Sequence, residues 1–172
     1  MPHRYAKGVM ATMQAKDVTF GRAILADLDQ LVRLRLGYLQ DDFGELSPDQ
    51  RTLIAAGLPA YFEHHLGRDI FAYVARDAKG TIVSCAWMLL VDKPPSPRFP
   101  HGRTGVLFNV YTVPERRRQG LARRVMERLI ADARERQLDV IELHATSDGY
   151  PLYSLLGFED DSNAHIAMRM ML

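Results

Sequence analysis

Apolar residues recur with two different periods along the chain, and each period predicts a different kind of element. Short apolar runs typical of buried strands cover residues 18–23, 70–76, 81–91, 105–112 and 140–145. Apolar residues at helical spacing predict one buried face in residues 26–40, formed by Leu28, Leu31, Val32, Leu34 and Leu36. The same spacing returns in the helix after Gly120, with Leu121, Val125, Leu129 and Ala133.

Capping and turn residues set the boundaries between these elements. Ser47 and Gln50 form a Ser-x-x-Gln capping box with Pro48 in the first turn, so a helix should begin there and end near Gly67. Three further segments are predicted to be turns or loops: 41–44, which should end the preceding helix, 77–80, and the proline-rich 93–102.

The order of these elements predicts one α/β domain. Two helices, a strand hairpin and a β-α-β-α-β succession give a mixed sheet layered with helices. The last two elements are a short helix near residue 150 and a closing strand at about 165–172. Residues 1–16 follow neither period and are predicted to form a flexible tail before the domain of residues 17–172.

Composition and charge narrow the class of protein. The 172 residues are 47% hydrophobic and 25% charged with a net charge of +1, so no global field favours nucleic acid or an acidic membrane. Eight arginines lie within 116–136, but acidic residues share that segment, and a solvated helix face explains most of them. Cys85, the single cysteine, is expected to be a buried core residue. With no span-length apolar run and no signal peptide, a cytoplasmic location is expected.

The segment 113–124 carries the most informative chemistry. It reads Val-Pro-Glu-Arg-Arg-Arg-Gln-Gly-Leu-Ala-Arg-Arg and places Arg117, Gly120 and Ala122 as Arg-x-x-Gly-x-Ala at the start of a helix. The first N–H groups of a helix have no partner inside it, and the helix dipole adds positive potential there. Gly120 lets a ligand approach the backbone. The sequence therefore predicts a phosphate or pyrophosphate site, and neither a P-loop nor a dinucleotide-binding pattern is present.

A second motif, 149–158, contains Leu152-Tyr153-x-x-x-Gly157-Phe158. Together the two motifs resemble the GNAT N-acetyltransferase superfamily, with the specific part of the resemblance in residues 105–158. The resemblance implies a mostly antiparallel GNAT-like sheet, acetyl-CoA as co-substrate and no metal. It also implies an acetyl-CoA site formed by Val110, Tyr111, Thr112, Arg117, Arg118, Gln119, Gly120, Leu121, Ala122, Arg123 and Thr146.

The resemblance gives each part of that site a role. The N–H groups of residues 118–123 hold the CoA pyrophosphate with help from the Arg117 side chain, and Thr146 offers a hydrogen bond. The strand edge at 110–112 pairs with the pantetheine arm, and a backbone N–H there stabilises the oxyanion. Tyr153 lies near the CoA sulfur and donates the proton that the leaving thiolate needs; the alternative is that it only packs on the cofactor.

The general base is not evident from the sequence. Relatives often use a carboxylate beside the cofactor strand, but residues 93–114 contain neither Asp nor Glu, and Asn109 occupies the strand instead. Four residues are candidates to act through water: Asp92, His101, His144 and Glu63.

The sequence thus predicts an N-acetyltransferase in which a primary amine attacks acetyl-CoA directly in a ternary complex, without a covalent Cys85 intermediate. The alternative is a non-catalytic acyl-CoA-binding or regulatory module of the same fold. The acceptor is a small-molecule amine or a peptide N-terminus, expected to be held by residues 47–66 and 93–102. No nucleic-acid or membrane partner is expected, and a homodimer stays open.

Overall fold

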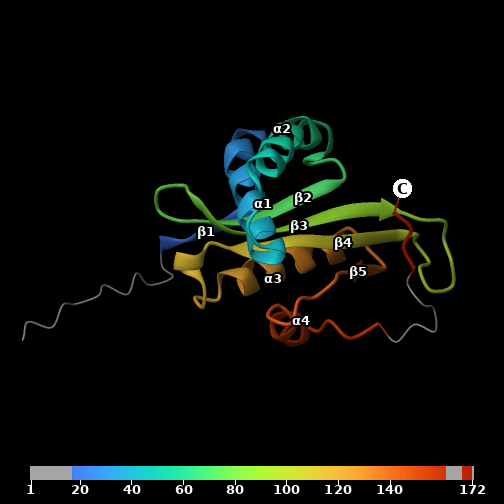
Figure 1. The fold of residues 1–172 in the computed structure, drawn as a ribbon. Helices are drawn as coiled ribbons and strands as arrows, with labels where there is room; N and C mark the ends of the chain where they lie inside the picture. The colour runs from blue at the N-terminus through green and yellow to red at the C-terminus, as the bar shows by residue number, and fades with distance from the viewer. Residues whose placement is uncertain (1–16, 162–167, 172) are drawn as a thin grey trace, which may run out of the picture.

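The structure, a computed structural model, describes residues 17–161 and 168–171 and is built around a five-stranded sheet (Figure 1). The strands lie in chain order: β1 (Thr19–Arg22), β2 (Ile70–Arg76), β3 (Ile82–Asp92), β4 (Arg103–Thr112) and β5 (Val140–Glu142). The first four pair antiparallel, and β5 pairs parallel with β4. The predicted mixed, mostly antiparallel sheet is therefore confirmed.

Helices cover both faces of the sheet. Figure 1 shows α1 (Leu28–Phe43) and α2 (Pro48–His65) on one face and α3 (Leu121–Glu135) on the other, with α4 (Tyr150–Leu155) beyond β5. Two short 3-10 helices complete the described elements, Leu25–Asp27 before α1 and Pro114–Arg116 before α3.

Two hydrophobic cores follow from the alternation of side chains along the central strands. In β2, Ile70, Ala72 and Val74 pack under α1 and α2, whereas Phe71, Tyr73 and Ala75 pack against α3. Because helices cover both faces of the sheet, residues 70–75 of β2 are all buried, and this explains their continuous run of hydrophobic residues in the sequence. The four residues predicted for the α3 stripe are all buried: Leu121, Val125, Leu129 and Ala133.

The predicted start of α2 is confirmed, and the predicted end of α1 is wrong. The Ser47 hydroxyl accepts from the Gln50 N–H at 3.2 Å, and the Gln50 side chain accepts from the Ser47 N–H at 2.9 Å. The helix expected to break at 41–44 continues through Phe43 and ends at Gly44, whose φ is 84°. Tyr38 bonds Asp42 and Arg117 pairs with Asp41, so these polar residues are accommodated within the helix.

The C-terminal elements are shorter than predicted. The strand expected over 140–145 ends at Glu142, because β4 provides partners only as far as Val106. Of the closing strand expected over 165–172, residues 165–167 and 172 lie outside the described part of the chain, and 168–171 form no strand. Residues 1–16, the predicted tail, also lie outside the described residues.

Replacing Leu129 by alanine tests the α3 core. Leu129 is fully buried, so the substitution should lower the free energy of unfolding by about 2–5 kcal/mol through lost burial and a cavity. Leu53→Ala is the matched control, because Leu53 is 76% exposed and its loss should cost less than about 0.5 kcal/mol. Equal losses in denaturant unfolding would contradict this packing.

Candidate functional site

β4 carries a bulge at Asn109. In its register with β3, Phe108 lies opposite Trp87 and Tyr111 opposite Cys85, so Asn109 and Val110 together face one residue. Asn109 has a φ of 52°, a left-handed conformation that asparagine reaches more easily than most residues, and it is 1% exposed. A bulge bends the strand and increases its twist, so β4 changes direction here.

The pairing between β4 and β5 ends just before this bulge. The last pair joins Val106 to Glu142, and among the described residues no strand lies on the β5 side of residues 107–112. We call this stretch the open edge of β4. It includes Val110, Tyr111 and Thr112, the residues predicted to pair with pantetheine. Backbone groups on an unpaired strand edge can bind an extended ligand as if it were another strand.

The loop after β4 presents a row of backbone N–H groups. Within the described part of the chain, the amides of residues 118–123 bond to no acceptor, and the first bonded amide is that of Arg124, 3.2 Å from the Gly120 carbonyl oxygen. Arg118 and Gly120 have φ angles of 61° and 73°, which turn the chain into α3. We call these six N–H groups the amide cradle. At the N-terminus of a 15-residue helix they can bind an anion.

The arginine side chains around the amide cradle have other contacts. Arg117 donates through Nε to the Thr112 carbonyl at 2.9 Å, and its guanidinium pairs with Asp41 on α1. Arg123 pairs with Glu127 at 2.8 Å. The predicted assistance from the Arg117 side chain would therefore require its pair with Asp41 to open.

Tyr153 lies on α4 with its ring against Phe158, the centroids 5.9 Å apart. Burial, with a smaller effect from Tyr38, raises the pKa of Tyr153 to about 12, so its phenol stays protonated at neutral pH. The Thr146 hydroxyl accepts from the Gly149 N–H at 3.1 Å and shapes the turn into α4. Its own O–H can still donate to another group.

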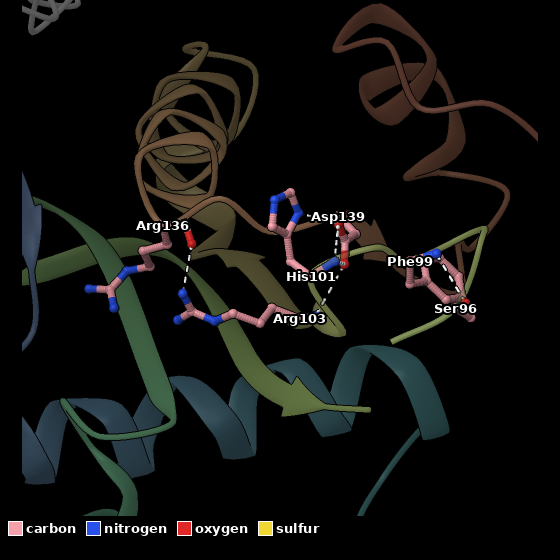
Figure 2. Close-up of polar contacts among 6 residues, drawn as sticks. All are labelled: Ser96, Phe99, His101, Arg103, Arg136 and Asp139. Carbon is pink, nitrogen blue, oxygen red and sulfur yellow. Dashed lines mark hydrogen bonds and ion pairs between the residues drawn. The ribbon is translucent and has the colours of Figure 1, made fainter. Parts of the chain in front are cut away.

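Two of the four base candidates lie at the wrong end of the sheet. Asp92 pairs in register with Arg103 at the start of β4, seven residues before Val110 and so about 23 Å away along the strand. Figure 2 shows His101 in the same region, with Nδ1 2.7 Å from Asp139. A single water cannot bridge either residue to the open edge of β4.

Asp139 has a structural role at that end (Figure 2). Its carboxylate also accepts from the backbone N–H groups of His101 and Arg103, and it joins the start of β4 to the turn after α3. Burial acts to raise the pKa of Asp139, but these hydrogen bonds lower it overall. The bond from the Arg103 side chain to the Arg136 carbonyl, at 2.9 Å, adds a second tie.

The other two candidates, His144 and Glu63, are exposed. His144 follows β5 by two residues, and Glu63 lies on α2. β4 itself carries no carboxylate, as the sequence indicated.

Cys85 is confirmed as a buried residue, and burial raises the pKa of its thiol to about 12, which opposes a nucleophilic role.

Sequence reasoning missed Arg35. Its Nη1 donates to the Asn109 Oδ1 at 3.1 Å, which places the guanidinium beside the bulge. Arg35 follows the buried Leu31 by four residues, so helical spacing alone puts it on the face of α1 that meets the sheet. The four-residue spacing from Leu31 is therefore the feature of the sequence that could have predicted the position of Arg35.

No group of three or more His, Cys, Asp or Glu side chains in the described ranges could hold a metal ion. None of the helices in these ranges is long and apolar enough to span a membrane.

Comparison with known proteins gives a consistent result. The model of the acetyltransferase (GNAT) family matches residues 30–158. The crystal structure of a predicted acetyltransferase with acetyl-CoA, from Clostridium acetobutylicum, is 30% identical, with a TM-score of 0.75 over 87% of this chain and 96% of that one. No curated protein matches the sequence.

Two more distant structures share the fold. A GCN5-related N-acetyltransferase from Ralstonia eutropha is 23% identical, with a TM-score of 0.69 over 88% of this chain and 98% of that one. The ribosomal-protein-alanine N-acetyltransferase from Brucella melitensis is 21% identical, with a TM-score of 0.63 over 88% and 99% of the two chains.

Ultraviolet titration of Tyr153→Phe beside the unmodified protein tests the state of this phenol. Because its pKa lies near 12 instead of the usual value of about 10, the folded protein keeps this proton while ordinary tyrosines ionise. The two proteins should show equal phenolate absorbance up to about pH 11, with circular dichroism confirming that both remain folded. An extra phenol titrating near pH 10 in the unmodified protein would contradict the buried setting.

Proposed function

Since the chain belongs to the acetyltransferase (GNAT) family, we propose that it transfers an acetyl group from acetyl-CoA to a primary amine within a ternary complex. The observation that supports this most strongly is that the amide cradle directly follows the open edge of β4. A ligand with a pyrophosphate at one end and an extended amide-containing arm at the other matches both features. Acetyl-CoA has this structure.

The two features would bind different parts of the donor. The amide cradle holds the pyrophosphate through N–H groups and the dipole of α3, without needing an arginine side chain. The pantetheine amides pair with the backbone of residues 110–112, which extends the sheet by one strand-like segment. The acetyl group then lies near the bulge at Asn109, between α1 and α4.

In the proposed reaction the neutral amine attacks the thioester carbonyl carbon. A C–N bond forms, and the carbonyl oxygen becomes an oxyanion that a backbone N–H of β4 stabilises. Collapse of this intermediate breaks the C–S bond and releases the CoA thiolate, which accepts a proton from Tyr153. The proton lost by the nitrogen passes to water or to a base such as His144 or Glu63, and Tyr153 is then reprotonated.

The lack of a carboxylate on β4 favours one alternative, a non-catalytic acyl-CoA-binding module. Such a module would bind acetyl-CoA without acetylating any amine. A small-molecule amine or a peptide N-terminus is the proposed acceptor. A cytoplasmic location and a homodimer stay predictions.

Tyr153→Phe tests the proposed chemistry. Removing the proton donor should lower kcat by about 10²- to 10⁴-fold in assays with a panel of primary amines, while the Kd for acetyl-CoA changes little. Tyr150→Phe is the matched control on the same helix, because the exposed Tyr150 hydroxyl bonds only Asp160, at 3.3 Å, among the residues that the structure describes.

The possible results distinguish a catalytic acetyltransferase from a non-catalytic acyl-CoA-binding module. An unchanged kcat for Tyr153→Phe would remove the proton-donor role. Tight acetyl-CoA binding by the unmodified protein without acetylation of any amine would favour the non-catalytic module.

A further inference from the structure

Arg35 is a half-buried cation next to the proposed acetyl position. It reaches from α1 to the bulge of β4, where Nη1 bonds the side chain of Asn109 at 3.1 Å. An arginine has five N–H donors, and within the described part of the chain this bond uses the only one with a partner. The remaining donors of Arg35 are not buried, because the Trp87 indole nitrogen is the only buried side-chain nitrogen or oxygen without a partner among the described residues; they are therefore accessible to a ligand.

No carboxylate in the described ranges pairs with Arg35. The acids on neighbouring elements are engaged elsewhere: Asp41 with Arg117, Asp42 with the Tyr38 hydroxyl, and Asp69 with His65. Other arginines facing the interior do have structural partners. Arg76 pairs with Asp27 at 2.7 Å, and Arg136 pairs with Asp132 at 2.6 Å. Arg35 therefore differs from them in having no direct ion pair, although Asp42 still interacts with its charge electrostatically.

Aromatic rings surround the guanidinium. Its Cζ lies 5.5 Å from the ring centroid of Tyr38 and 5.9 Å from that of Trp87. Tyr61 on α2 is also close enough to interact electrostatically with Arg35. Burial lowers the pKa of Arg35 and raises those of the two tyrosines, so the group remains one cation with two neutral phenols, of which the Tyr38 hydroxyl already donates to Asp42. Such an environment strengthens an ion pair with an incoming anion.

The anion that this group would meet is not a CoA phosphate. The amide cradle belongs to α3, which packs on the opposite face of the sheet from α1. Tyr38, whose ring lies against Arg35, also lies near enough to Tyr153 to influence its titration. The guanidinium is therefore on the acceptor side of the proposed reaction centre.

We propose that Arg35, flanked by Tyr38 and Tyr61, binds a carboxylate of the acceptor, and that the acceptor is a small amino acid-like amine. This rests on the proposed acetyltransferase function and specifies its substrate class. The carboxylate pairs with the guanidinium while the amine points along β4 toward the thioester. An acceptor without an anionic group cannot form this charge-assisted pair, which provides the discrimination.

The test compares L-amino acids with their carboxamides, which keep the amine and remove the charge. The unmodified protein should favour the carboxylates, and Arg35→Met should reduce kcat/KM for them by about 10- to 100-fold, mainly through KM. The same variant also removes the bond to Asn109, so the loss of kcat/KM for the carboxamides measures any disturbance of the bulge and should be at least about tenfold smaller than the loss for the carboxylates. Arg35→Lys should recover part of the loss, because lysine keeps the charge but not the planar set of donors.

Arg33→Met is the matched control. Arg33 lies on the same helix but donates to the Ile82 carbonyl at 2.7 Å, so its loss affects the tie between α1 and the sheet and not the preference between the two acceptor series. The acetyl-CoA Kd of each variant reports whether the fold is intact. Equal losses on carboxylates and carboxamides, or no preference in the unmodified protein, would overturn the assignment.

A binding measurement tests the anion site independently of the proposed acetyl transfer. Calorimetric titration of N-acetyl-L-amino acids and their carboxamides into the CoA-loaded protein requires no turnover. Binding of the carboxylates that Arg35→Met abolishes would support the anion site even if no amine is acetylated. Equal binding of both series to the unmodified protein would overturn it even if acetylation is observed.

Discussion

The bulge at Asn109 is the constraint on which the proposed site depends. The pairing of β4 with β5 stops where β5 ends, and the bulge follows on the unpaired part of β4. Asn109 adopts a left-handed conformation three residues beyond the last pair, at Val106, and the strand bends there. The buried amide needs partners, and the Arg35 guanidinium satisfies its oxygen at 3.1 Å. The same bond thus stabilises the bulge and holds a cation beside it.

Binding and chemistry are assigned to different parts of the fold. The amide cradle is made of backbone N–H groups, so its ability to bind an anion depends on the backbone conformation and not on particular arginine side chains. The side chains of Arg117 and Arg123 are engaged in ion pairs. The proposed proton donor, Tyr153, comes from a short helix beyond β5, and burial raises the pKa of its phenol. α1 supplies the charge that would recognise the acceptor. In this proposal the donor and the acceptor are bound by elements on opposite faces of the sheet.

The sequence predicted best what is decided locally. The capping box at Ser47, the 77–80 hairpin turn and the apolar stripe of α3 each depend on residues within a few positions of one another, and all three are found. The length of β5 and the bulge depend on pairing between distant strands, which no local pattern records. His101 and Asp92 were plausible bases because they lie close to β4 in sequence, yet they lie at its start, far from residues 107–112. Arg35 was not predicted because arginine side chains are usually exposed, and the sequence alone does not show that this one faces the sheet.

The central claim is that acetyl-CoA occupies the amide cradle and the open edge of β4 together. Backbone amide NMR with acetyl-CoA and, separately, with acetyl-pantetheine tests it most directly. Acetyl-CoA should shift the amides of residues 118–123 and of 107–112, whereas acetyl-pantetheine, which lacks the pyrophosphate, should shift mainly the second set. Saturating acetyl-CoA that leaves the amides of 118–123 unchanged would contradict the account.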